Sequence, residues 1–423
     1  MLTLKQLREN PEAAAKRLAV KGVDAQETIA QIIALDDRRK ALQTELDGNL
    51  AEQNNIAKQI GQLFKAGQTD EANAAKEQTA VLKESSKKLE EQKNATEKEL
   101  NDLLVTLPNF PHESVPTGMT AEDNVVVREG GSRPELSADA QPHWELIKKY
   151  DIIDFDLGTK LTGAGFPVYK RQGAALQRAL IAYFLDKNTA AGYEEVMPPY
   201  MVNEASGFGT GQLPDKEGQM YHATEDNFYL IPTAEVPVTN IFRDTVLDAK
   251  DLPVKLTAYT PCFRREAGSY GKDVRGLNRL HQFDKVEIVQ LSHPDKSYEA
   301  LEGMVRHVEN IIKELELPYR ILRLCGGDMS FTSALTFDFE VWSAAQERWL
   351  EVSSVSNFES FQANRLKARF KGDDKKTQLV HTLNGSSLAL PRILAAILEN
   401  YQTPEGIRVP NVLVPYTRFN TIR

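Results

Sequence analysis

The chain has 423 residues, more than one usual domain, so a small domain joined to a large one is expected. Its 41% hydrophobic and 26% charged residues are typical of a soluble globular protein, and its two distant cysteines, Cys262 and Cys325, exclude a disulfide framework and a zinc site built on Cys-x-x-Cys. The net charge of −9 does not by itself indicate a nucleic-acid partner, although a local basic stripe, rather than the total, sets the field that a phosphate backbone meets.

The N-terminal residues lack the apolar stretch that a signal peptide needs. No run in the chain approaches the ~18 apolar residues of a membrane span. We therefore expect a cytoplasmic protein with no membrane partner, and the two cysteines agree with a reducing compartment.

Residues 28 to about 107 contain no proline and carry a heptad pattern of apolar residues. The a and d positions of the first arm are Ile32, Leu35, Arg39, Leu42, Leu46, Asn49, Gln53, Ile56, Ile60 and Leu63, and the second arm continues the seam with Leu82, Leu89, Leu100, Leu103 and Leu107. The pattern breaks at 64–70, where Gly67 can cap one helix and Thr69 or Asp70 can begin the next. These features predict an antiparallel α-helical coiled-coil hairpin whose arms of ~35 residues are about 50 Å long.

Two interpretations of this hairpin are open. A solvated dimerisation coil is the commoner use of such a pattern, and residue pattern alone favours it. An RNA-binding arm is the other, since cations on both arms could contact phosphates although each lies among carboxylates: Arg38, Arg39, Lys40, Lys83, Lys87 and Lys88.

The sequence predicts three segments: a hairpin at 1–108, a Pro/Gly-containing connector at 109–140, and a larger domain at 141–423. In the larger domain, helices are expected at 172–190 and 297–316, and strands at 255–264, 281–290, 319–325, 335–342 and 348–355. Adjacent strands without intervening helices favour an α+β fold with an antiparallel sheet over a doubly wound one. No Gly-x-x-x-x-Gly-Lys-Ser/Thr occurs, so any ATP is not held in a P-loop.

The most informative stretch is 263–289, FRREAGSYGKDVRGLNRLHQFDKVEIV. An apolar run ends in Arg264-Arg265-Glu266, a loop with three glycines (Gly268, Gly271 and Gly276) and several cations follows, and a second strand-like run begins near His281. Arginine binds phosphate oxygens bidentately, and glycine lets the backbone approach a ligand closely. An ordinary hairpin with a solvated charged tip is the alternative.

In order and spacing this stretch resembles motif 2 of class II aminoacyl-tRNA synthetases, and in detail the seryl family. Four other blocks resemble that family in the expected order: the motif 1 segment Gly192–Pro199, Thr233-Ala234-Glu235, Glu351-Val352-Ser353-Ser354, and the motif 3 segment Asn384-Gly385-Ser386 with Arg392 and Leu398-Glu399-Asn400. The chain departs from the usual motif 3 at Ser387 and Pro391, where the family often has glycine. A proline near a helix start costs little.

The resemblance implies the fold and the residues of a site. The fold is a class II antiparallel catalytic sheet with flanking helices, and motif 1 implies a homodimer. An ATP site would comprise Arg264, Arg265, Glu266, Phe283, Glu351, Val352, Ser353, Ser354 and Arg392, with Arg264, Glu351 and Arg392 catalytic and with Glu351 and Ser354 binding Mg²⁺. A serine site would comprise Thr233, Ala234, Glu235, Arg264, Glu287, Asn384 and Ser386.

Plainer explanations exist for each of these residues taken singly. An isolated arginine or glutamate is more often part of a surface ion pair, and Glu287 could lie on an exposed strand face. Asn384 and Ser386 could form a polar turn before a helix, with Ser386 as its N-cap. For His281 a structural role is expected, because adenylate formation needs no proton abstraction.

The resemblance implies that the protein activates L-serine with ATP to seryl-adenylate and transfers serine to the 3′ end of tRNA(Ser), whose long variable arm the hairpin would hold. It leaves tRNA(Sec) open as a second substrate. The main alternative is a non-catalytic paralogue that retains the fold, against which the intact set of Arg264, Glu266, Glu351 and Arg392 argues. A pure coiled-coil interaction protein does not account for the long α/β segment after the hairpin.

Overall fold

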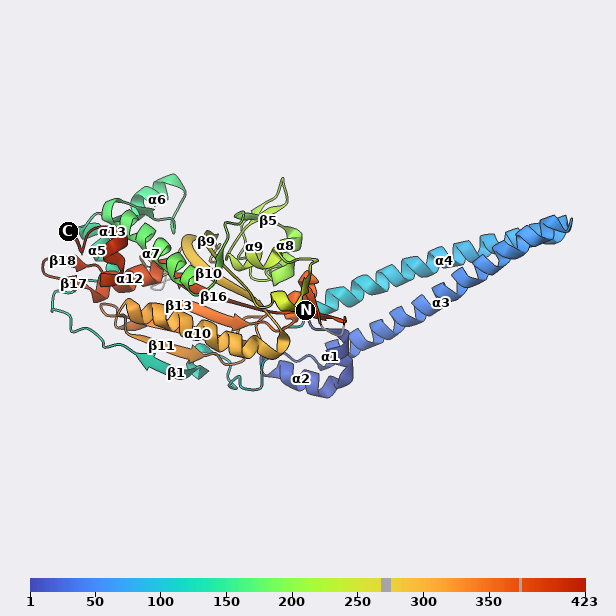
Figure 1. Cartoon of the computed structure of the whole chain (residues 1–423), viewed down its shortest axis with the longest axis horizontal. Coiled ribbons are helices and arrows are strands. Elements are labelled where there is room, and N and C mark those ends of the chain that lie inside the picture. The colour runs from blue at the N-terminus through green and yellow to red at the C-terminus, as the bar shows by residue number, and fades with distance from the viewer. Residues whose placement is uncertain (268–274, 373–374) are drawn as a thin grey trace. The chain divides into compact units, whose positions relative to one another are not determined.

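The computed structural model describes residues 1–267, 275–372 and 375–423, and the chain separates into two compact units, Met1–Pro108 and Asn109–Arg423 (Figure 1). Gly268 and Gly271 of the predicted glycine-containing loop lie outside the described residues. Among the described residues, no helix combines the length and the apolar character needed to cross a membrane.

The first unit consists of helices. They are α1 (Leu4–Glu9), α2 (Pro11–Ala19), α3 (Gln26–Lys65) and α4 (Thr69–Leu104), and the last two run side by side as the predicted hairpin (Figure 1). The expected break is confirmed, because Gly67 adopts φ +75° and the Gln68 amide donates to the Leu63 carbonyl at 3.0 Å. Glycine closes the first helix in the left-handed conformation that side chains disfavour.

The hairpin is held together by its own seam. Leu42, Leu46 and Leu89 form a buried cluster between the two long helices. Gln53, at a polar seam position, donates through Nε2 to the Ser86 hydroxyl at 2.7 Å. Apolar contacts and a satisfied polar position therefore stabilise α3 against α4, as the heptad pattern predicts.

The second unit is built on a mixed sheet of eight strands among the described residues. In spatial order they are β1 (Val125–Gly130), β11 (Tyr319–Arg323), β12 (Leu335–Ser343), β13 (Arg348–Asn357), β16 (His381–Ala389), β10 (Gln282–Ser292), β9 (Val254–Phe263) and β4 (Glu194–Glu195). Every neighbouring pair is antiparallel except the edge strand β4, which runs parallel to β9. The predicted antiparallel sheet is confirmed.

Three longer helices, α7 (Arg171–Ala190), α10 (Ser297–Glu314) and α12 (Leu390–Asn400), contact the central strands. The helix α10 buries Leu301, Met304 and Val308 along one stripe, because residues three or four apart share a helix face. The expected helices 172–190 and 297–316 thus correspond to α7 and α10, and the five expected strands to β9–β13.

Shorter elements complete the unit. The short helices are α5 (His143–Lys149), α6 (Phe155–Leu161), α8 (Glu204–Thr210), α9 (Glu235–Asn240), α11 (Phe361–Leu366) and α13 (Val414–Thr417). The small sheets comprise β2 (Ile153–Asp154) with β3 (Val168–Tyr169), β5 (Met201–Asn203) with β7 (Phe228–Leu230) and β6 (His222–Ala223), β15 (Thr377–Leu379) with β14 (Arg369–Lys371) and β8 (Val246–Asp248), and β17 (Gln402–Thr403) with β18 (Gly406–Arg408) and β19 (Thr421–Ile422).

Two elements differ from the sequence-based expectation. The segment expected as a connector, 109–140, contributes the edge strand β1 to the large sheet. The motif 3 residues Asn384 and Ser386 lie inside β16 rather than in a turn, and the N-cap of α12 is Ala389. The N-cap alternative for Ser386 is therefore wrong.

Candidate active site

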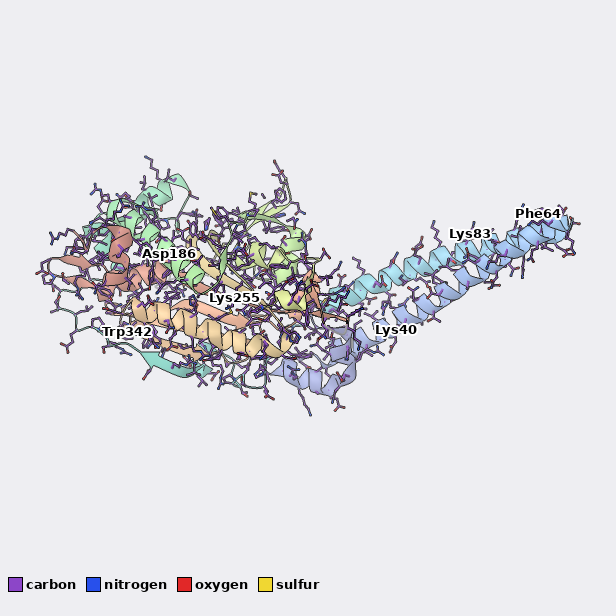
Figure 2. The ribbon with its side chains drawn as sticks, in the orientation of Figure 1. Lys40, Phe64, Lys83, Asp186, Lys255 and Trp342 are labelled. Atoms are coloured by element: carbon purple, nitrogen blue, oxygen red, sulfur yellow. The ribbon has the colours of Figure 1, made fainter. Side chains whose placement is uncertain are left out.

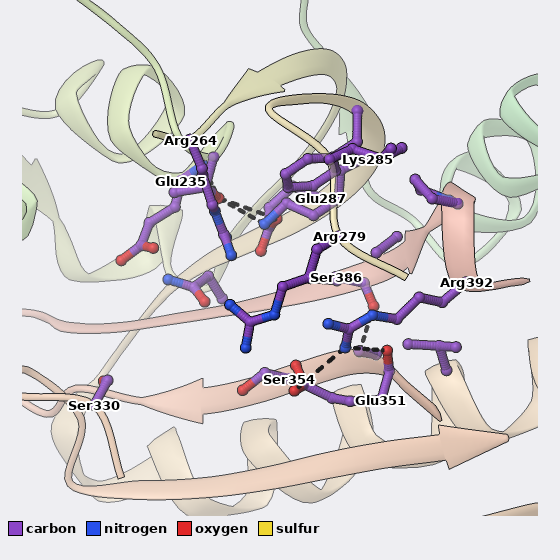
Figure 3. A pocket seen from close by; sticks show the side chains of 18 of the residues that line it. Glu235, Arg264, Arg279, Lys285, Glu287, Ser330, Glu351, Ser354, Ser386 and Arg392 are labelled. Carbon is purple, nitrogen blue, oxygen red and sulfur yellow. Dashed lines mark hydrogen bonds and ion pairs between the residues drawn. The ribbon is translucent and has the colours of Figure 1, made fainter. Parts of the chain in front are cut away.

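A cavity of about 440 Å³ opens on the central strands of the sheet (Figure 3). Its lining residues come from β10, β13, β16, the start of α9 and the first turn of α12, with further side chains from connecting segments, including Arg264 directly after β9. Figure 3 shows Arg264, Lys285 and Glu287 grouped on one side, and Glu351 and Arg392 on the other. The cavity therefore has two ends of different composition.

Charged groups are buried and paired at the first end. The ammonium Nζ of Lys285 lies 2.5 Å from Oε2 of Glu287 and donates to the Thr233 hydroxyl at 2.8 Å. Thr233 in turn donates to Glu287 Oε2 at 3.3 Å. The side chains of Lys285 and Glu287 are only 7% and 2% exposed, so either charge alone would be costly to bury.

Glu235 brings a second carboxyl group to this end. It is buried, and it accepts a hydrogen bond of 2.6 Å from Nε2 of Gln362. Burial, and after it the negative charge of Glu287, raises the pKa of Glu235 to about 7. A cation bound here would therefore lie near the carboxyl groups of Glu235 and Glu287, with Lys285 as the nearby positive charge.

Asn384 and Ser386 complete the first end from β16. In the antiparallel ladder Ser386 lies directly opposite Glu287. The side-chain amide of Asn384 is buried near enough to the Glu235 carboxyl to lower its pKa, but the amide nitrogen Nδ2 makes no hydrogen bond of good geometry. A buried donor without a well-formed hydrogen bond costs free energy, and a small polar ligand in the cavity would satisfy it.

Arg264 and Phe283 lie against each other in the cavity wall. Arg264 is at the end of β9, its Nε donates to the Pro232 carbonyl at 3.3 Å, and its guanidinium carbon lies 5.2 Å from the centre of the Phe283 ring. Arg279 lies nearby and pairs with Glu266, with Nη1 2.9 Å from Oε2. Two guanidinium groups and an aromatic face suit phosphate and a planar base.

Arg392 and Glu351 mark the second end. Nη1 of Arg392 donates to the Glu351 carbonyl at 2.9 Å and lies 3.7 Å from Oε2 of its carboxylate, and Nε donates to the Asn278 carbonyl at 3.1 Å. The Glu351 side chain is 50% exposed, so it can bind a ligand without losing a buried partner. Ser354 follows on the same strand, β13 (Figure 3).

A metal would find few protein ligands here. Within the ranges that the structure describes, no group of three or more histidine, cysteine, aspartate and glutamate side chains is placed to hold a metal ion. Glu351 and Ser354 both line the cavity and present the hard oxygen atoms that Mg²⁺ prefers. They fit a metal that reaches the site together with phosphate oxygens.

The structure brings most of the predicted site residues to one cavity. Two do not line it: Ala234 is buried in a core cluster, and Arg265 is exposed, with its amide donating to the Gln219 carbonyl at 2.9 Å. His281 also lies outside the cavity lining, where Nδ1 is 2.9 Å from the Tyr221 hydroxyl, as its expected structural role requires.

Several lining residues are absent from the sequence-based prediction. They include Gln212, Asn278, Arg279, Lys285, Ser330 and Thr332. Lys285 could have been found, because it is two residues from Glu287 in a strand and so shares its face. The segments carrying Ser330 and Thr332 show no periodic pattern that would have marked them.

Of the candidate RNA contacts on the hairpin, only some are unengaged. Arg39 and Lys40 both pair with the buried Asp36, at 2.9 and 2.6 Å, and Lys88 pairs with Glu84 at 2.9 Å. Arg38, Lys83 and Lys87 are exposed, and no ion pair is recorded for them among the described residues. Figure 2 shows Lys83 on α4 and Lys40 on α3.

Comparisons with known proteins cover the entire chain. The family model described as the seryl-tRNA synthetase N-terminal domain matches residues 1–111, and that described as the tRNA synthetase class II core domain (G, H, P, S and T) matches residues 219–401. The serine–tRNA ligase of Salinibacter ruber is 49% identical over 424 residues, covering 100% of this chain and 99% of its own. That of Trichlorobacter lovleyi is 47% identical over 422 residues, covering 98% of each.

The fold comparison agrees. The crystal structure of seryl-tRNA synthetase from Pyrococcus horikoshii, complexed with ATP, aligns with a TM-score of 0.92 at 35% sequence identity. The alignment covers 100% of this chain and 99% of that one. The similarity therefore includes both the hairpin and the sheet.

Proposed function

The chain belongs to the seryl-tRNA synthetase family, and we propose that its cavity binds serine at the end lined by Glu287 and ATP at the end lined by Glu351 and Arg392. The protein is a serine–tRNA ligase of class II. One observation carries the assignment of the site: four separate blocks of sequence contribute Thr233, Arg264 with Glu287, Glu351, and Ser386 to the same cavity.

The reaction needs charge neutralisation more than covalent help. A carboxylate oxygen of serine attacks the α-phosphorus of ATP, an O–P bond forms, and the bond to the leaving pyrophosphate breaks. In the proposed reaction Arg264, which lines the cavity, donates hydrogen bonds from its planar guanidinium to both the attacking carboxylate and the α-phosphate. Arg392 binds the outer phosphates, and Phe283 and Glu266 bind the adenine.

The serine end recognises the ammonium and the hydroxyl. Glu287 and Glu235 accept hydrogen bonds from the ammonium, and Thr233 fixes the position of Glu287. Ser386 and the side-chain amide of Asn384 bind the serine hydroxyl. Alanine would leave these polar groups buried and unpaired, which is the physical basis for rejecting it.

Mg²⁺ would be held by Glu351 and Ser354 together with phosphate oxygens. Such an ion neutralises charge on the phosphates during displacement. The protein's own contribution at this end is to orient Glu351, whose backbone carbonyl accepts from Arg392.

We propose that tRNA binds to the hairpin and that a second copy of the chain binds to the motif 1 segment. Arg38, Lys83 and Lys87 are exposed cations available to the phosphates of tRNA(Ser), and the proposal extends to tRNA(Sec) as a second acceptor. Met197, 81% exposed beside the edge strand β4, is an apolar side chain that a second copy of the chain would cover in a homodimer. We propose that the protein is cytoplasmic.

The test is pyrophosphate exchange with each of the twenty amino acids, followed by charging of tRNA(Ser) and tRNA(Sec). Exchange that depends on serine, with alanine and threonine far weaker, supports the site assignment. Exchange with no amino acid would favour the non-catalytic paralogue instead.

A further inference from the structure

A buried carboxylate lies behind the nucleotide end of the cavity. Glu399, in the last turns of α12, is fully buried, and its two oxygens accept from the backbone amide of His143 at 3.0 Å, from His143 Nδ1 at 2.8 Å, from the Ala345 amide at 3.2 Å, from Gln346 Nε2 at 3.1 Å and from the Ser343 hydroxyl. Burial acts to raise the pKa of Glu399, but the hydrogen bonds, led by that of His143, outweigh it and the pKa lies below its usual value. This carboxylate is a fixed anionic centre.

His143 connects that centre to the cavity wall. Its side chain is fully buried, and while Nδ1 faces Glu399, Nε2 accepts a hydrogen bond of 2.9 Å from the backbone amide of Leu277. An imidazole that donates through one nitrogen and accepts through the other is neutral, and its tautomer is fixed. Leu277 lines the cavity.

The approach of the two segments is close. Gly276 adopts φ +63°, and a Cβ atom there would lie 2.3 Å from Nε2 of His143. Only a residue without a side chain lets the backbone at Leu277 come within hydrogen-bond distance of the imidazole.

A second path closes the hydrogen bonds into a ring. Asn278 donates through Nδ2 to Oε1 of Gln346 at 3.1 Å, and Gln346 returns to Glu399. The carbonyl of Asn278 accepts from Nε of Arg392 at 3.1 Å. His143 and Gln346 are thus both hydrogen-bonded to Glu399 and hold the backbone at 277–278. The carbonyl of Asn278 in turn orients the Arg392 guanidinium.

We propose that His143 and Gln346 are positioning residues for ATP: they hold the backbone at Leu277 and Asn278 and, through it, the phosphate-binding Arg392. The proposal rests on the assignment of this end of the cavity to ATP. The serine end lies on β10 and β16, whereas the ring lies on α5, α12 and connecting segments, and the two share none of these bonds, so we expect the affinity for serine to be independent of the ring.

A matched pair of variants tests it through the KM values for ATP and serine in pyrophosphate exchange. In His143→Asn the amide reaches the place of Nδ1 and keeps the bond to Glu399, but it loses the acceptor for Leu277. In His143→Gln the amide oxygen reaches the place of Nε2 and keeps that acceptor. We expect His143→Asn to raise the KM for ATP about tenfold, the effect of one lost hydrogen bond to the site, with serine KM unchanged, and His143→Gln to raise it much less.

Two further variants keep the test decisive if His143 variants do not fold. Gln346→Ala, at a half-buried position, should raise the KM for ATP selectively. Tyr401→Phe, which removes a buried bond of 2.7 Å to the Leu315 carbonyl next to the same helix, should lower the melting temperature and leave both KM values unchanged.

Equal effects of His143→Asn and His143→Gln, or equal rises in the KM for serine and ATP, would overturn the positioning role. A wild-type enzyme without serine-dependent exchange would instead overturn the proposed function, so the two failures are distinguishable.

Discussion

Charged side chains of the hairpin and of the cavity lie in opposite environments. On α4, Lys88 and Glu84 pair at 2.9 Å with 69% and 71% of their side chains exposed, whereas Lys285 and Glu287 pair at 2.5 Å with 7% and 2% exposed. An exposed pair is screened by water and salt, but breaking a buried pair leaves an uncompensated charge. A single substitution in the cavity should therefore have a large effect on activity or stability. A single substitution on the hairpin should have a small effect, and only the loss of several exposed cations together should weaken tRNA binding.

The largest single-residue effect is expected at Arg264. Arg264→Ala removes a cation that, in the proposed site, faces the reacting phosphate, and loss of one such contact costs ~10²–10³ in rate. Pyrophosphate exchange measures this directly, and Arg265→Ala is the matched control because Arg265 is exposed outside the cavity lining. Exchange by Arg264→Ala within threefold of wild type would contradict its role.

Ser386→Ala should act on serine alone. Loss of one neutral hydrogen bond to the substrate costs about 1–2 kcal/mol, or roughly 5–30-fold in the KM for serine. Ser387→Ala is the control, because the Ser387 hydroxyl donates to Asn188 at 2.8 Å, away from the cavity, so this variant should lose stability and keep its KM for serine. A changed KM for ATP with an unchanged KM for serine would place Ser386 at the nucleotide instead.

Glu235 should make the stability of the catalytic unit depend on pH. Its pKa is about 7 in the folded protein against 4.5 for a free glutamate, so between these values the folded state binds more protons than the unfolded state and stability falls as pH rises. Glu235→Gln removes this loss. Between about pH 4.5 and pH 7 its free energy of unfolding should rise relative to that of the wild type by an amount on the order of 1–3 kcal/mol. Denaturant unfolding at several pH values measures the difference, and a constant difference would refute the raised pKa.

The smallest effect is expected on the hairpin. Lys88→Gln breaks the exposed pair with Glu84, and the melting temperature should not change measurably. A clear loss of stability in a thermal scan would mean that surface charges on the hairpin matter to its fold, and the contrast with the cavity would fail.

The same contrast explains what the sequence could predict. The seam of the hairpin repeats every seven residues, so the heptad pattern alone places Leu42, Leu46 and Leu89 together and Gly67 at the break. The five strands β9–β13 were also predicted, because their apolar runs are long and bounded by turn residues.

Strand β16 was missed because its own residues oppose the assignment. Asn384, Gly385, Ser386 and Ser387 have low strand propensity, and only pairing with β10 on one side and β13 on the other makes them a strand. The cavity was predicted through resemblance to a family rather than through a local pattern, since the residues that line it are distant in sequence. For this reason Glu287 was predicted as a site residue, whereas its buried partner Lys285 was not.

The central claim is that the cavity forms the adenylate and the hairpin binds the tRNA. The most direct test measures pyrophosphate exchange and tRNA charging in one variant with a shortened hairpin. Replacing residues 44–92 by a short Gly/Ser linker keeps Asp36 with its partners and the bond of 3.0 Å between Lys93 and Gln43, which lie on facing helices. Serine-dependent pyrophosphate exchange should persist at the wild-type rate, because Arg264, Glu287 and Glu351 are untouched, while charging of tRNA(Ser) should collapse with the lost phosphate contacts. Full charging of tRNA(Ser) by this variant would contradict the account and restore the hairpin as a solvated coil.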